Sequence, residues 1–275
     1  MTLQLSPESL YATLGLPDAP VLLDLRDADD CAAQPRIIPG ALRRDAGQVR
    51  DWIHTIPRRS QTILYSGPRD QFGSTVADEL NTLGYNACRL EGDLDAWLAA
   101  GYPTVKIRGD LRVPGGSRWI TRERPKIDRL ACPWLVRRFI DAEAQFFYTP
   151  SHRVRVDAKS LGAEPYDIPE VTFSHRGPRC TFDTFLDEFE LNDVVLTDLA
   201  QIIRAADTGA LEQSIEAPGL LAISLGLSAN MPDDILLMEH AMSIYDGLYA
   251  WRKKASHETH SWPQPANQPE VTSSR

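Results

Sequence analysis

A run of basic side chains between Leu111 and Arg138 offers the clearest chemistry in this sequence. The run holds eight basic residues against two acidic ones, in a chain whose net charge at pH 7 is −9. Guanidinium groups carry a fixed fork of donors that suits tetrahedral oxyanions and carboxylates. We expect an anion-binding group that takes a small oxyanion or the carboxylates of a thiol adduct. Its members are Arg122, Arg124, Lys126 and Arg129. The alternative is a charged surface paired with the protein's own carboxylates.

A second set of side chains could bind a single metal ion. His175 and Cys180 are separated by a turn that can bring both side chains to one point, while Glu239 and His240 share a long predicted helix with Asp246. Imidazole and carboxylate groups are common metal ligands. The predicted set is therefore His175, Glu239, His240 and Asp246, although no short-spaced ligand motif is present. Alternatively, His240 is a hydrogen-bonded core residue and Cys180 a small buried hydrophobe.

The four cysteines are scattered and form no CxxC pair. This spacing favours reduced thiols over a disulfide framework. Cys132 is the one cysteine within the basic run at 111–138, and a cationic setting can lower the pKa of a thiol. Cys132 is accordingly a weak candidate for a catalytic residue.

The sequence predicts two domains of different kinds, which must position the basic, metal-binding and cysteine side chains described above. From residue 6 to about residue 102, helical and strand periods alternate, as in an α/β fold. Short apolar runs have the length of parallel strands buried on both faces, at 21–25, 62–65 and 87–90. Helices are expected at 6–14, 74–83 and 93–100, the first with Ser6 as its cap and Pro7 at its first position. The sequence predicts a parallel sheet flanked by helices.

Beyond a Gly- and Pro-rich stretch the pattern becomes more helical. The longest periodic segments are 186–206 and 235–253, and strands are expected at 145–148, 154–156 and 171–173. A helix capped by Asp128 would bury Trp134, Leu135 and Phe139. We predict a front domain (1–106), a linker (107–116), a helix-rich α+β back domain (117–263) and a disordered tail (264–275).

The front domain resembles the rhodanese family. The resemblance rests on LDLR at 23–26, RIIPGA at 36–41 and LEGDLDAW at 90–97, in that order. In that family a cysteine opens the loop after a central strand, and the loop amides stabilise its sulfur. Ser66 stands at that position here, so it is a degenerate nucleophile that cannot carry a persulfide. Arg69 in the same loop could bind an oxyanion or be a solvated charge, and the domain could instead be a scaffold for a protein partner.

The back domain resembles the carboxy-terminal domain of the chromate-resistance family. The segment 119–135, WITRERPKIDRLACPWL, carries the strongest match. Further matching blocks include YDIP at 166–169, FSH at 173–175, RAAD at 204–207 and YDGLYAW at 245–251. The resemblance implies a role in chromate stress. Some members with a DNA-binding front module look like regulators, whereas this chain has the rhodanese-like module.

Three functions follow in order of preference. The first is a chromate-stress accessory or sensing protein that binds an oxyanion or metal in the back domain. The second is a sulfurtransferase-type enzyme acting on thiol or chromate–thiol adducts. The third is a chromate-responsive transcriptional regulator, ranked last because the net charge of −9 disfavours binding to nucleic acid.

The expected setting is the cytoplasm of a bacterium. The longest apolar runs are far too short to cross a bilayer, and the first residues lack the pattern of a secretory signal. We therefore expect no membrane partner.

Overall fold

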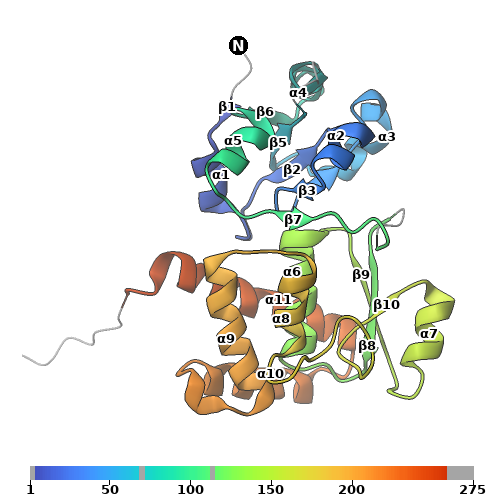
Figure 1. Ribbon diagram of the computed structural model, residues 1–275, viewed down its shortest axis with the longest axis vertical. Coiled ribbons are helices and arrows are strands. Elements are labelled where there is room, and N and C mark those ends of the chain that lie inside the picture. The colour runs from blue at the N-terminus through green and yellow to red at the C-terminus, as the bar shows by residue number, and fades with distance from the viewer. Residues whose placement is uncertain (1–3, 68–71, 112–114, 259–275) are drawn as a thin grey trace, which may run out of the picture.

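A computed structural model describes residues 4–67, 72–111 and 115–258 of the 275-residue chain. Figure 1 shows a small α/β domain, coloured blue to green, above a larger helix-rich domain coloured green to red. The predicted fold class, a parallel sheet with flanking helices followed by a helix-rich domain, is confirmed. No helix among the described residues is long and apolar enough to span a membrane.

The front domain is built on a five-stranded parallel sheet of order β1-β6-β5-β2-β4. Its strands are β1 (Gln4–Leu5), β2 (Val21–Asp24), β4 (Leu42–Arg43), β5 (Gln61–Tyr65) and β6 (Asn86–Leu90). Its helices are α1 (Pro7–Thr13), α2 (Ala28–Ala33), α3 (Val49–Trp52), α4 (Phe72–Thr82) and α5 (Asp93–Ala99). All three predicted strands and all three predicted helices of this domain form.

Local sequence explains why α1 begins where it does. The Ser6 hydroxyl accepts a hydrogen bond from the Ser9 amide, and Pro7 occupies the first helical position. Proline loses nothing there because the first amides of a helix have no partner within the helix. The predicted start is confirmed.

The back domain combines a three-stranded parallel sheet of order β10-β8-β9 with six helices. The strands are β8 (Arg118–Arg122), β9 (Gln145–Thr149) and β10 (Glu164–Pro165). The helices are α6 (Asp128–Leu135), α7 (Val154–Leu161), α8 (Thr181–Glu188), α9 (Val194–Thr208), α10 (Ala217–Asn230) and α11 (Asp234–Ala250). Helix α6 contacts α8, α9 and α11, and its residues from Leu130 to Leu135 are all buried. Single π-helical turns extend α6 and α11, over Val136–Ile140 and Trp251–Ala255.

Three sequence predictions for the back domain are wrong. The segment 186–206 is broken into two helices, because the Asp193 carboxylate caps a new helix by accepting from the Leu196 amide. The expected strand at 154–156 is helix α7, which buries Val154 and Ala158 one turn apart. At 171–173 only Phe173 makes an isolated bridge, to Tyr166.

The two domains share one apolar core. The same cluster of buried residues includes Leu10 and Trp97 from the front domain and Phe139 and Tyr249 from the back domain. A methyl group added at Gly15 would lie 2.3 Å from the Phe139 ring, so the backbone approaches that ring closely. The domains are therefore packed against each other.

Polar contacts also cross the boundary. Strand β3 (Arg36–Ile37) pairs antiparallel with β7 (Val105–Lys106) inside the front domain, and Arg36 of this pair reaches across to form an ion pair with Glu190. The Lys253 ammonium donates to the Tyr11 and Leu14 carbonyls at 2.7 and 2.9 Å. In the predicted linker, Arg108 pairs with Glu188 of the back domain. The domain boundaries themselves stay a prediction.

Candidate functional site

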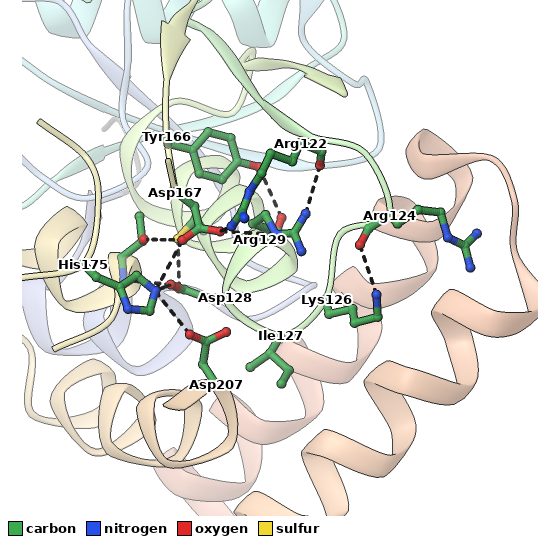
Figure 2. Close-up of polar contacts among 12 residues, drawn as sticks. Arg122, Arg124, Lys126, Ile127, Asp128, Arg129, Tyr166, Asp167, His175 and Asp207 are labelled. Carbon is green, nitrogen blue, oxygen red and sulfur yellow. Dashed lines mark hydrogen bonds and ion pairs between the residues drawn. The ribbon is translucent and has the colours of Figure 1, made fainter. Parts of the chain in front are cut away.

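Six charged side chains from five parts of the back domain meet in one place, which we call the ionic centre (Figure 2). Its members are Arg122 at the end of β8, Asp128 and Arg129 at the start of α6, Asp167 after β10, His175 before α8 and Asp207 near the end of α9. The first amides of a helix have no partner within the helix, so they can bind side chains from distant segments. The five segments are spread over residues 122 to 207, so only the tertiary fold brings them together.

Asp128 is the buried base of the ionic centre, with a side chain 1% exposed. Its two oxygens accept hydrogen bonds from the Thr181 and Phe182 amides at 2.7 and 2.9 Å. Burial raises the pKa of Asp128, despite the hydrogen bond from His175 that favours the charged form. Contrary to expectation, Asp128 does not cap its own helix: it is the first residue of α6, and its carboxylate binds the first amides of α8.

Asp167 joins the two arginines to the rest of the ionic centre. One carboxylate oxygen lies 2.9 Å from Arg122 and 3.2 Å from Arg129, while the other accepts the Thr181 hydroxyl at 3.0 Å. Burial acts to raise the pKa of Asp167, but hydrogen bonds from His175 and Arg122 outweigh it and lower the pKa. Asp167 is thereby held as a carboxylate.

His175 occupies the middle of the ionic centre. Its Nε2 atom lies 3.4 Å from Asp128, 3.3 Å from Asp167 and 3.2 Å from Asp207 (Figure 2). The nearby carboxylates of Asp128, Asp167 and Asp207 favour the protonated imidazole and raise the pKa of His175 to about 12. The side chains of His175 and Asp207 are 39% and 20% exposed, so the ionic centre opens to solvent on this side.

Half of the predicted anion-binding group belongs to this arrangement. Arg122 and Arg129 do, but they face the protein's own Asp167. Arg124 instead donates to the Ser228 and Met231 carbonyls at the end of α10. The nearest acceptor of the Lys126 ammonium is the Arg124 carbonyl at 3.5 Å, so the four cations do not converge on one point.

Arg122 and Arg129 differ in burial, so their replacement should change the free energy of unfolding by different amounts. We expect Arg129→Gln to lower the free energy of unfolding by about 2 kcal/mol, because Asp167 would lose one partner while 8% exposed. Arg122→Gln should cost about 1 kcal/mol, since the Arg122 side chain is 39% exposed. Urea denaturation measures both, with the exposed Arg155→Gln as control. Equal losses for Arg129 and Arg122 would contradict the burial argument.

The predicted metal-binding set is not formed. Glu239 pairs with Arg137 at 2.6 Å, and Asp246 pairs with Arg138 at 2.8 Å and accepts from the Trp134 indole. His240 is exposed on α11. Asp246 is directed toward α6 because the two helices pack together. Only His175 of the four meets other potential ligands, and those are three aspartates.

The surroundings of Cys132 do not favour the reactive thiol predicted from the sequence. Its side chain is fully buried, and its sulfur lies 3.4 Å from an Asp128 oxygen. Burial and the nearby Asp128 charge raise the pKa of Cys132 well above its ordinary value. Cys180 is similarly buried, and burial raises its pKa. These thiols are protonated hydrophobes.

Sequence reasoning missed Asp167 and Asp207. Both lie in blocks that resemble the chromate-resistance family, YDIP at 166–169 and RAAD at 204–207, and FSH at 173–175 holds His175. One ligand atom each from Asp128, His175 and Asp207 lie within 4.8 Å of one another. The signal was therefore the position of ionisable residues within the matching blocks.

Ser66 lies in a separate region of the front domain. The residue is buried, its amide donates to Asp93 at 3.0 Å, and its hydroxyl lies 3.4 Å from the same oxygen. Arg89 pairs with Asp93 at 2.6 Å. A cavity of about 250 Å³ lies beside these groups, and its lining includes Arg26, Asp30, Ser66, Asp93 and Asp95. Arg69 lies outside the described residues.

Residues 119–252 match the family model described as "ChrB, C-terminal domain". The chain is 36% identical over 135 residues to Protein ChrB of Cupriavidus metallidurans, a match that covers 49% of this chain and 40% of the relative. The chain thus spans about two fifths of the length of that relative.

Several solved structures are similar to part of this chain. A rhodanese-related protein from Thermoplasma volcanium is 20% identical with a TM-score of 0.32, over 37% of this chain and 96% of its own. A thiosulfate sulfurtransferase from Pseudomonas aeruginosa is 25% identical with a TM-score of 0.35, over 40% of this chain and 20% of its own. A Lactobacillus plantarum protein is 21% identical with a TM-score of 0.36, over 38% of this chain and 88% of its own.

Proposed function

We propose that this chain is a chromate-stress accessory or sensing protein whose ligand-binding site is the ionic centre. One observation carries the proposal: within a ChrB-type domain, three carboxylates converge on the single Nε2 atom of His175 at 3.2 to 3.4 Å. Buried charge is costly to maintain and often marks a functional site. The exposed edge at His175 and Asp207 supplies access for a small ligand.

The ligand that we propose is a small oxyanion or a thiol adduct at the rim of the ionic centre. Arg122 is the cation best placed for it, because its side chain is 39% exposed while it contacts Asp167. Its Nε atom is buried without a hydrogen-bond partner. The front domain would serve as a scaffold or a docking surface for a protein partner, in the cytoplasm.

A sulfurtransferase-type enzyme is the weaker alternative. It needs a thiol that can become a thiolate, yet Cys31, Cys88, Cys132 and Cys180 are all buried. Ser66 lines the front-domain cavity in place of a thiol. A regulatory function would require a DNA-binding surface, and the acidic net charge of −9 gives no support to one.

Chromate tolerance tests the proposal. A chromate-sensitive bacterial host that expresses the full chain should grow at higher chromate concentrations than the same host with an empty vector. Arg122→Gln should abolish most of this gain, because it removes the exposed cation that would bind the oxyanion. The matched control is Arg155→Gln, which alters an exposed arginine paired with Glu170. Full tolerance with Arg122→Gln at equal protein level, or no gain with the wild type, would refute the proposal.

A further inference from the structure

We infer that the ionic centre binds one divalent metal ion through Asp128, His175 and Asp207. This inference goes beyond the proposed function, which needs a ligand site but no metal. It rests on the placement of individual donor atoms, on the groups that orient them and on the access from solvent. It also replaces the metal-binding set predicted from the sequence, of which only His175 is retained.

The donor atoms are spaced like ligands around a common ion. Metal bonds of about 2.0–2.2 Å place neighbouring ligand atoms about 3.0–3.5 Å apart in octahedral and tetrahedral sites. His175 Nε2 lies 3.4 Å from Asp128 Oδ2 and 3.2 Å from Asp207 Oδ2. One N–H group can point at only one acceptor, and these contacts are longer than a good charge-assisted hydrogen bond. Hydrogen bonding by His175 alone therefore does not account for the convergence.

The Oδ2 atom of Asp128 keeps one lone pair free on the side that faces His175. A carboxylate offers about four acceptor positions. Oδ1 receives the Phe182 amide and the Cys132 thiol, whereas Oδ2 receives only the Thr181 amide besides its contact with His175. Oδ2 is the oxygen that would bind the ion.

Surrounding groups fix these ligands as an outer shell does in metal sites. Asp128 is held by two backbone amides of α8. Asp167, 3.3 Å from His175 Nε2, is held by the Thr181 hydroxyl and two arginines, so it is better suited to orient the imidazole than to bind the ion. Among the described residues, the Asp207 carboxylate pairs only with His175, which leaves it available.

The donor set indicates which ions fit. One imidazole and two carboxylates suit Mn²⁺, Fe²⁺ or Zn²⁺, whereas soft ions prefer thiolates. Cys132 gives its hydrogen to Asp128 and does not offer a thiolate. Three protein ligands leave coordination positions open, as in metal sites that bind water or a further ligand. The 39% exposure of His175 provides the route of access.

Metal titration of the full chain tests the inference. The protein, freed of metal with a chelator, should bind about one equivalent of Mn²⁺ or Zn²⁺ by isothermal titration calorimetry. Asp207→Asn and His175→Gln should each weaken binding at least about tenfold, since even outer-shell changes cost about 10–100-fold. The matched controls are Glu239→Gln and His240→Gln, which lie in the same domain but outside the ionic centre. They should bind like the wild type.

Cobalt spectroscopy identifies the donor atoms independently. The Co²⁺ protein should show weak ligand-field bands without the intense thiolate-to-cobalt absorption, because neither Cys132 nor Cys180 is a ligand. Three results would overturn the inference: no stoichiometric binding to the wild type, unchanged affinity in both ligand variants, or a thiolate band. Circular dichroism confirms folding, and Asp207→Asn keeps the test informative because the side chain is 20% exposed and asparagine has nearly the same shape as aspartate. If the chain confers chromate tolerance but binds no metal, the metal-site inference is wrong and the proposed function is unaffected.

Discussion

Replacing Asp128 by alanine is expected to lower the free energy of unfolding by about 4 kcal/mol. The substitution leaves the Thr181 and Phe182 amides at the start of α8 without acceptors in a buried place. Each orphaned donor costs about 1–3 kcal/mol. Removing the charge returns part of the cost of burying it, as the raised pKa of Asp128 indicates, but the two donors outweigh that return.

Urea denaturation followed by circular dichroism measures this loss. Asp128→Asn should lose about half as much as Asp128→Ala, because its one remaining oxygen can still accept from one amide. Asp187→Ala is the matched control, since Asp187 belongs to α8 itself but is 41% exposed. Its effect should stay within about 1 kcal/mol. A loss for Asp128→Ala as small as that of the control would show that α8 does not depend on this carboxylate.

The front domain was predictable because its determinants are local. Apolar runs of strand length, the Ser6 cap and Pro7 act over a few neighbouring residues, and each is readable without knowledge of the rest of the chain. In the back domain the alternating pattern Val-Arg-Val at 154–156 predicted a strand, but the segment is helical. Three residues are too few to decide, because a strand and a helix can both bury Val154. Only the burial of Ala158 one turn later distinguishes them, and it depends on tertiary packing.

The cationic run shows why sequence proximity does not establish a site. Arg122 ends strand β8, after which Arg124 and Ile127 adopt positive φ angles of 58° and 36°. The chain therefore turns sharply, and it sends Arg124 toward α10 while Arg129 turns back to Asp167. A non-glycine residue in this region is uncommon, so the pattern of residue types could not predict the turn.

The metal-binding prediction failed for a related reason. It placed three ligands on one helix, but α11 packs on α6, and Asp246 meets Arg138 there. The residues that do meet His175 come from the start of α6, from the segment after β10 and from near the end of α9, at points that only the tertiary fold brings together. Ionisable residues within the family-like blocks were the available signal, and they would have indicated Asp207.

Sulfur transfer from thiosulfate to cyanide is expected to stay at background, both in the wild type and after Ser66→Cys. A cysteine at residue 66 would be buried and would face Asp93, whose oxygen lies 3.4 Å from the present hydroxyl. Burial and a neighbouring carboxylate both disfavour a thiolate. The Ser66 amide, which would otherwise stabilise a sulfur anion, already donates to Asp93. We therefore expect the new thiol to have a pKa above the usual value of about 8.5.

The double variant Ser66→Cys with Asp93→Asn isolates the part played by Asp93. Removing the carboxylate should lower the thiol pKa by about 1 and raise the alkylation rate by iodoacetamide near pH 7 by about tenfold. The four native cysteines are buried, so the wild type serves as the low-reactivity control for the same assay. Arg89, which now pairs with Asp93, would be free to favour the thiolate. A thiol pKa well below 8.5 in Ser66→Cys alone, or clear turnover by that variant, would show that Asp93 does not suppress sulfur chemistry at this position.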